Sequence, residues 1–134
     1  MRNWFYFIVG IIAAISAVTH TIDGLATELP ALNEANLEHI TQSVFAFSYH
    51  IVAADHLGIG IALIIMAFKK NMALTKSAAW VVIAINFTRV VVSIITIFTA
   101  VNALGNAGTF WIPAVANTVC ILLLLLGTRV KNKI

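Results

Sequence analysis

Residues 48–60 read SYHIVAADHLGIG and lie within an apolar segment, about residues 41–68, that is long enough to cross a bilayer. His50, Asp55 and His56 stand inside this segment. Ionisable side chains are costly in the hydrocarbon core of a membrane, so they normally have partners there and mark a functional site. The stretch therefore predicts a transmembrane helix and a polar site within it.

The composition places the whole chain in a membrane. Of its 134 residues, 61% are hydrophobic and only 10% are charged, whereas about a quarter of the residues in a soluble domain are charged. The formal net charge of +3 is small, and no basic patch is interleaved with aromatic residues, which argues against nucleic acid as a partner. Cys120 is the only cysteine, so the chain cannot form an internal disulfide bond.

Hydropathy predicts a single domain, residues 1–134, with four transmembrane helices that pack as a compact all-α bundle. The expected spans are about residues 4–22, 41–68, 77–101 and 109–127. The first span has an alternative interpretation as a signal peptide, because Arg2 precedes it and small residues occur at Ala14, Ser16 and Ala17.

The connection between the first two spans, residues 23–38, contains every acidic residue except Asp55. Gly24 and Pro30 predict that the first helix is broken there, because both residue types disfavour a helix interior. Asn33 is a candidate N-cap for the next helix. A helix from residue 33 to residue 68 would be ~54 Å long, so it would protrude from the membrane or kink.

Lysine and arginine gather on one side of the predicted membrane domain. Four spans place Arg2, the loop with Lys69, Lys70 and Lys76, and the tail from Arg129 on the same side, and the two loops on the other side contain neither residue type. Loops rich in lysine and arginine stay in the cytoplasm. We therefore expect both termini in the cytoplasm, with the inner membrane as the location if the protein is bacterial.

Counting residues from the basic ends of the spans gives the depth of each polar side chain. Asp55 and Arg89 lie 14 and 13 residues from the nearest loop lysines, which is ~20 Å along a helix. His56 and Asn117 fall in the same layer. A buried charge needs a partner, so we expect an ion pair between Asp55 and Arg89. The alternative is that this pair only fixes the register of the helices.

Two further patterns extend this polar layer. Asn86, Arg89 and Ser93 are spaced three or four residues apart, so they share one face of the third span. His56 is a candidate proton acceptor, because histidine changes its charge near physiological pH. The alternative for His56 is a neutral imidazole that bonds a neighbouring hydroxyl or carbonyl group.

His20 and His50 share a second layer, ~27–28 Å from the basic end of their spans. Two histidines on neighbouring helices can ligate a haem or a transition metal. The alternative is that both are ordinary residues of the membrane interface.

The second span is polar on several sides, because His50, Asp55 and His56 are separated by ~100° per residue around the helix axis. Such a helix must be surrounded by protein, so we expect it at the centre of the bundle or at an oligomer interface. Its stripe of small residues permits the close approach of another helix. These residues are Ala54, Gly58 and Ala62.

Three classes of function fit this pattern. The first is the binding or conduction of a small solute, a proton or a lipophilic molecule, for which a chain of this length would need to form a homo-oligomer. Its expected binding residues are Asp55, His56, Arg89, His50, Asn86, Ser93 and Asn117. The second is a redox subunit that binds haem or a metal through His20 and His50. The third is an accessory structural subunit of a larger membrane complex.

The common enzyme signatures do not occur in the sequence: it has no glycine-rich phosphate loop, no His-Glu-x-x-His, no Gly-x-Ser-x-Gly and no Cys-x-x-Cys. We therefore predict no catalytic residue and favour a role other than catalysis.

Overall fold

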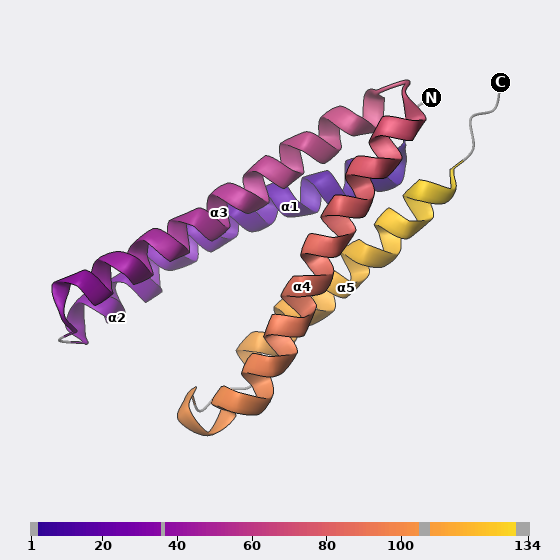
Figure 1. The fold of residues 1–134 in the computed structure, drawn as a ribbon. Helices are drawn as coiled ribbons and strands as arrows, with labels where there is room; N and C mark the ends of the chain where they lie inside the picture. The colour runs from indigo at the N-terminus through magenta and orange to yellow at the C-terminus, as the bar shows by residue number, and fades with distance from the viewer. Residues whose placement is uncertain (1–2, 36, 105–107, 131–134) are drawn as a thin grey trace. The chain divides into compact units, whose positions relative to one another are not determined.

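The computed structural model describes residues 3–35, 37–104 and 108–130, and within these ranges the chain is helical and has no strand (Figure 1). The prediction of an all-α protein is confirmed. The elements in chain order are α1 (Trp4–Asp23), the π-helical segment η1 (Gly24–Glu28), α2 (Leu29–Glu34), α3 (His39–Phe68), α4 (Met72–Leu104) and α5 (Gly108–Arg129).

Four helical stretches are long and apolar enough to cross a membrane: Trp4–Glu34, His39–Phe68, Ala73–Phe98 and Trp111–Arg129. Three of them match the predicted spans to within a few residues, and the first is longer than predicted. Many large apolar side chains on these helices are exposed, among them Phe98 at 78% and Ile112 at 74%. A surface with this much exposed hydrocarbon is suited to contact with lipid.

The first helix does not break at Gly24 or Pro30, contrary to the prediction. Asp23, Glu28 and Leu29 all keep right-handed helical dihedral angles. The N–H of Leu29 donates to the carbonyl of Gly24, so the spacing of the hydrogen bonds widens locally from four residues to five. Pro30 follows in the first turn of α2, where its missing N–H costs little. The wider turn before the proline therefore lets the helix continue.

The second long helix begins at His39 and not at Asn33, which corrects the predicted N-cap. Asn33 belongs to the last turn of α2, and the N–H of Ala35 donates to the carbonyl of Leu32 at 3.3 Å just beyond it. Asn33 therefore lies in the continuation of the first helix and does not cap the next one. The resulting α3 has 30 residues, or ~45 Å.

The chain divides into two compact units, Gly10–Ile65 on the one hand and Met1–Val9 with Met66–Ile134 on the other. The acidic and the basic residues are separated between the same two units. All five acidic residues and all four histidines belong to Gly10–Ile65, and all eight lysines and arginines belong to the second unit. The organisation of residues 1–134 as a single membrane domain stays a prediction.

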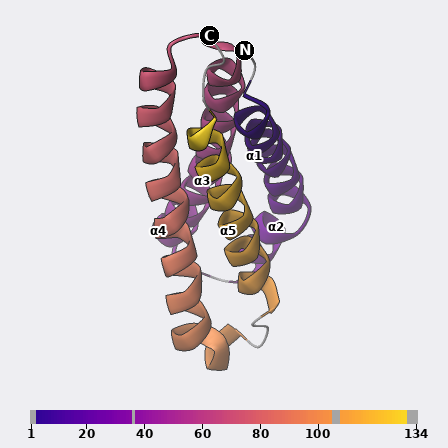
Figure 2. The ribbon, with the colours of Figure 1, turned by 90° about the vertical axis from the view of Figure 1, so that its right-hand side faces the viewer.

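In the second unit, α4 and α5 run side by side (Figure 2). Apolar side chains on both helices are buried; they include Val82, Ile83, Ile97, Ala114, Cys120 and Leu124.

Asn3 joins the ends of three helices in this unit. Its side-chain amide donates a hydrogen bond of 2.9 Å to the carbonyl of Gly127, and its backbone N–H donates one of 2.8 Å to the carbonyl of Ala67. Its side-chain oxygen accepts the N–H of Tyr6 at 3.4 Å, as an N-cap does. Tyr6 is fully buried against Gly127, where a Cβ would lie 2.5 Å from the Tyr6 ring. The start of α1 and the ends of α3 and α5 therefore lie at one level.

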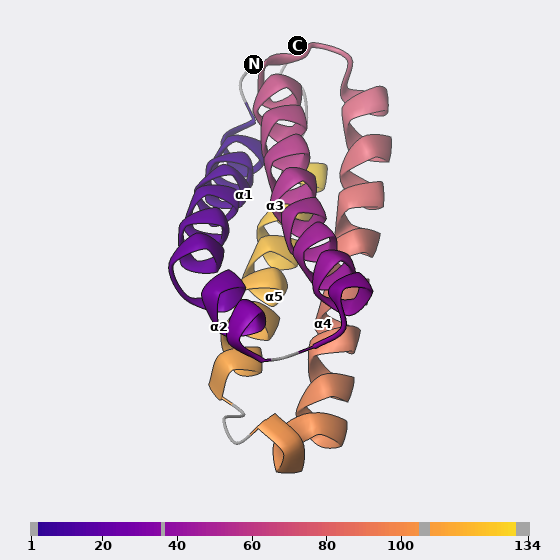
Figure 3. The ribbon, with the colours of Figure 1, turned by 90° about the vertical axis from the view of Figure 1, so that its left-hand side faces the viewer.

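In the Gly10–Ile65 unit, α1 and α2 run beside α3 (Figures 1 and 3). The helices approach most closely where two glycines face each other. A Cβ on Gly60 would lie 2.8 Å from the carbonyl oxygen of Gly10 and 2.8 Å from the backbone nitrogen of Ala14. The predicted stripe around Gly58 is exposed instead, and a Cβ on Gly58 would meet nothing within 4 Å.

Candidate ligand-binding groove between the first and third helices

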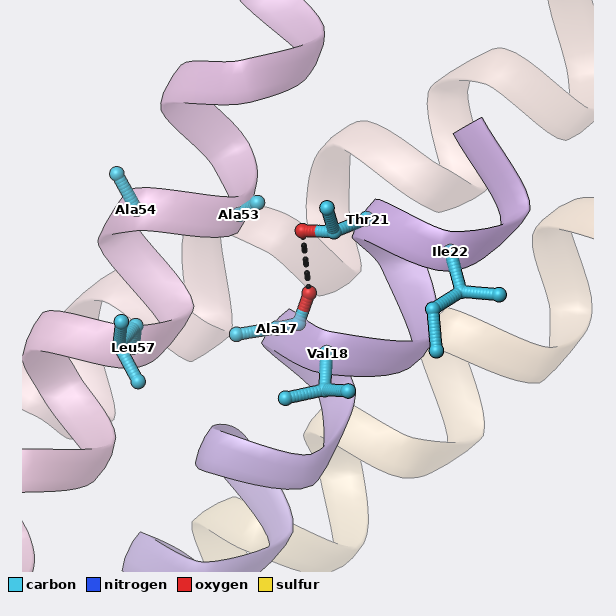
Figure 4. A pocket seen from close by; sticks show the side chains of 7 residues that line it. All are labelled: Ala17, Val18, Thr21, Ile22, Ala53, Ala54 and Leu57. Atoms are coloured by element: carbon cyan, nitrogen blue, oxygen red, sulfur yellow. Dashed lines mark hydrogen bonds between the residues drawn. The ribbon is translucent and has the colours of Figure 1, made fainter. Parts of the chain in front are cut away.

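An apolar groove lies between α1 and α3 within the Gly10–Ile65 unit (Figure 4). Its volume is about 300 Å³, at the lower end of the range of about 300–1,000 Å³ that is usual for small-molecule sites. Residues one turn apart on each helix line it, because such residues share a helix face. They are Ala17, Val18, Thr21 and Ile22 of α1 and Ala53, Ala54 and Leu57 of α3.

Two alanines form the floor of the groove, and larger side chains form its walls. Ala17 is 4% exposed and Ala53 is 9% exposed, whereas Ile22 is 61% and Leu57 44% exposed. The groove thus exists because two small residues face each other between the helices. Larger side chains at either alanine would fill it.

The groove offers a ligand almost only hydrocarbon. Thr21 has the one polar side chain in the lining, and its hydroxyl donates to the carbonyl of Ala17 at 2.9 Å (dashed line in Figure 4). A polar group placed in the groove would therefore lose its hydrogen bonds to water without replacement. The groove lies in the half of α1 remote from its N-terminus, since Ala17 and Ile22 are ~20 and ~27 Å along the helix from Trp4.

Beside the groove, Tyr49 of α3 is held against His20 of α1. The two rings are nearly parallel, with centroids 3.9 Å apart and an angle of 14° between their planes. The Tyr49 hydroxyl donates a hydrogen bond of 2.8 Å to the backbone carbonyl of His20. A Cβ on Gly24 would overlap the Tyr49 ring, so this contact needs glycine at the first residue of η1.

A second pocket of about 430 Å³ lies on another face of α1, around the helix from the groove. It is lined by Thr19, His20, Ile22, Asp23 and Ala26. Ile22 lines both cavities. Nε2 of His20 is buried and has no hydrogen-bond partner among the described residues. The Asp23 side chain is exposed and makes no capping hydrogen bond to η1.

The predicted residues of α3 lie close to the groove in sequence but do not line it. Asp55 and His50 are exposed, and His56 is partly buried. Nδ1 of His56 lies 2.7 Å from the carbonyl of Val52, so it must donate there. This bond agrees with the interpretation of His56 as an imidazole that bonds a neighbouring carbonyl.

The other predicted binding residues belong to the second unit. Asn86 is buried, and Arg89 and Ser93 are partly buried, whereas the intervening Phe87 and Val92 are exposed. The polar stripe of α4 therefore lies on the inward face of the helix, as its spacing predicts.

The two predicted asparagines of this unit bond their own helices. The Asn86 amide donates to the carbonyl of Val82 at 2.9 Å, and the Asn117 amide donates to that of Pro113 at 2.7 Å. Asp55 and Arg89 belong to different units. Their ion pair, the polar cavity built on it and the homo-oligomer or larger complex stay predictions.

The predicted metal or haem site also stays a prediction. Among the described residues, no group of three or more histidine, cysteine, aspartate or glutamate side chains is placed to hold a metal ion. The neighbour of His20 across the helix pair is Tyr49, whose ring meets the His50 ring edge-on with centroids 6.4 Å apart.

Sequence reasoning missed Tyr49, Asp23 and the alanine floor of the groove. Tyr49 could have been found, because it lies at almost the depth of His20 when residues are counted from the basic ends of the spans. Ala17 and Ala53 carry no signal of their own, because alanine is common on every span of this chain.

Comparison of the chain with protein-family models, with curated proteins and with solved structures finds no match.

Proposed function

We propose that this protein binds a lipophilic molecule within the membrane, in the groove between α1 and α3. The observation that carries the proposal is a cavity of about 300 Å³ whose lining residues are almost entirely apolar. In a bilayer such a groove is open to hydrocarbon chains and excludes polar solutes. A small solute or a proton would instead need the predicted polar layer around Asp55, His56 and Arg89.

We further propose that both termini are cytoplasmic, so that the groove faces the outer leaflet. The bonds that join Asn3 to Ala67 and Gly127 support this topology. Each of these three residues has a basic residue close to it in the sequence. Arg2 directly precedes Asn3, Lys69 lies two positions after Ala67, and Arg129 lies two positions after Gly127. The basic residues therefore cluster at one end, and such clusters stay on the cytoplasmic side.

A photoreactive probe tests the groove directly. The protein is reconstituted in phosphatidylcholine nanodiscs with a fatty alcohol that carries a diazirine near the end of its chain. After irradiation, the labelled peptides are identified by mass spectrometry. We expect the label to concentrate on residues 17–22 and 53–57. Labelling spread evenly over all exposed apolar residues would show that the groove binds nothing specific.

A matched pair of substitutions separates the groove from the rest of α3. Ala53→Leu fills the floor and should lower labelling by about fivefold, because the added side chain takes the place of the probe. Ala62→Leu adds the same atoms at an exposed position of the same helix and should leave labelling unchanged. Leu57→Ala widens the groove and should keep or increase labelling. Equal labelling of the Ala53 and Ala62 variants would contradict the proposal.

A further inference from the structure

We infer that the basic end of the second unit binds an anionic phospholipid. This is the end that we propose to be cytoplasmic, and the inference does not depend on the groove. Lys69 and Lys70 directly follow α3, Lys76 lies in the second turn of α4, and Arg129 is the last residue of α5. The side chains of Lys69, Lys70 and Arg129 are exposed, so their cations are accessible to a ligand.

The helix ends that carry these cations lie together. Asn3 bonds the carbonyls of Ala67 and Gly127, which lie two positions before Lys69 and Arg129 respectively. α4 and α5 run side by side and are joined by residues 105–107, so they are antiparallel, and the start of α4 lies at the end of α5. The basic side chains of three helices therefore gather at one end of this unit.

The unit contains no aspartate or glutamate that could neutralise these cations. All five acidic residues of the chain belong to Gly10–Ile65, and all eight lysines and arginines belong to the second unit. Basic residues next to a membrane span attract anionic lipids. A zwitterionic head group has no net charge, so it gains less from the same surface.

The carbonyl groups at these helix ends are partly satisfied, which favours an anion. The C-terminal end of a helix carries a partial negative charge that repels anions. Here the carbonyl of Ala67 accepts the N–H of Asn3 at 2.8 Å. The carbonyl of Gly127 accepts the Asn3 amide at 2.9 Å and the N–H of Val130 at 3.3 Å. These donors weaken the repulsion, so the lysine and arginine charges dominate.

A row of aromatic rings adjoins the cations and favours a lipid over a free phosphate ion. The rings of Trp4 and Phe7, and those of Phe7 and Phe68, meet edge-on with centroids 5.8 Å apart. Trp4 is 53% and Phe68 54% exposed, and Phe68 directly precedes Lys69. Such rings lie at the level of the head groups. A phosphate ion would use only the cations, whereas a phospholipid uses the cations and the rings.

Quenching of tryptophan fluorescence by brominated lipids tests this assignment. The double variant Trp80→Phe with Trp111→Phe retains Trp4 as its only tryptophan, and Trp4→Phe with Trp80→Phe retains Trp111. Trp111 lies ~27 Å along α5 from Arg129, so it reports on the opposite end as a control. Each variant is reconstituted in phosphatidylcholine bilayers with increasing fractions of dibrominated phosphatidylglycerol or dibrominated phosphatidylcholine.

We expect phosphatidylglycerol to be preferred over phosphatidylcholine about fivefold at Trp4, the ratio that one basic residue provides near an anionic lipid surface. At Trp111 we expect no preference. Equal quenching of Trp4 by the two lipids would overturn the inference. A preference as strong at Trp111 as at Trp4 would show that the anionic lipid is not bound at the basic end.

Two sets of substitutions in the variant that retains Trp4 connect the preference to the cations. Lys69→Gln, Lys70→Gln and Arg129→Gln together remove three charges at exposed positions and should reduce the preference to about one. Lys69→Arg, Lys70→Arg and Arg129→Lys keep the charges and should keep the preference. A preference that persists without the three charges would contradict their role. The diazirine probe tests the groove separately, so either proposal can fail while the other stands.

Discussion

The ring of Tyr49 lies flat on the ring of His20, 3.9 Å away, while the Tyr49 hydroxyl bonds the His20 backbone carbonyl at 2.8 Å. One side chain of α3 therefore holds both the side chain and the backbone of one residue of α1. The contact lies directly before Gly24, where the spacing of hydrogen bonds in the first helix widens.

Tyr49→Phe should destabilise the protein, because it leaves the His20 carbonyl without this donor while keeping the stacked rings. We expect a loss of ~1 kcal/mol in the free energy of unfolding, measured by thermal denaturation in mild detergent. Tyr6→Phe is the matched control. The Tyr6 hydroxyl is buried without a partner among the described residues, so its removal should be neutral or stabilising. A larger loss for Tyr6→Phe than for Tyr49→Phe would contradict this account.

Gly60→Ala should cost more than Gly58→Ala, although the two glycines lie on the same helix two residues apart. A methyl group on Gly60 would collide with the backbone of α1, and such overpacking costs ~1–3 kcal/mol. A methyl group on Gly58 meets open space, and alanine favours a helix over glycine by ~1 kcal/mol. Melting temperatures of the two variants decide the matter, and equal shifts would argue against the close approach of Gly10 and Gly60.

Arg89→Ala should lower the melting temperature more than Lys70→Ala. If Asp55 and Arg89 form the predicted ion pair, loss of one partner leaves a charge without its counter-charge in the membrane, at a cost of at least ~2 kcal/mol. Lys70 is exposed beyond the end of α3, so its loss should matter little. The double variant Asp55→Asn with Arg89→Ala should recover part of the loss. Mild and equal effects of the single changes would rule out the pair.

A visible spectrum with elemental analysis tests the predicted redox class on protein purified in mild detergent. If His20 and His50 ligate a haem, the protein has a Soret band with stoichiometric iron, and His20→Ala and His50→Ala each abolish it. If the apolar groove is the functional site instead, we expect a colourless preparation without stoichiometric metal. A cofactor that survives both substitutions would place its site elsewhere in the chain.

Hydropathy was sufficient to predict the four apolar helices, because bilayer thickness sets their length whatever their neighbours are. The predicted break of the first helix at Gly24 and Pro30 was wrong. Local propensity predicts a break at both residues, whereas in the structure a π-helical turn carries the helix past them, and its first residue, Gly24, lies against the Tyr49 ring. A contact between residues 25 positions apart leaves no local pattern.

The depth of a side chain could be predicted from the sequence, but its direction could not. Counting from the basic ends correctly places His20 and the residues near His50 at one level. Tyr49 and His50 differ by only ~1.5 Å in depth but by ~100° around the helix axis, and that rotation decides which of them meets His20. The groove depends on the same rotation, because Ala17 and Ala53 must face each other.

The hydrogen bond from Asn3 to Gly127 spans 124 positions of the chain, and this separation has a consequence for biogenesis. The first helix leaves the ribosome long before its partner does. Until α5 enters the membrane, the Asn3 amide lacks Gly127 as its acceptor and the Tyr6 ring lacks the surface that buries it. Helices of membrane proteins insert before they associate, so these contacts form only when α5, which is synthesised after α1, packs against the start of α1.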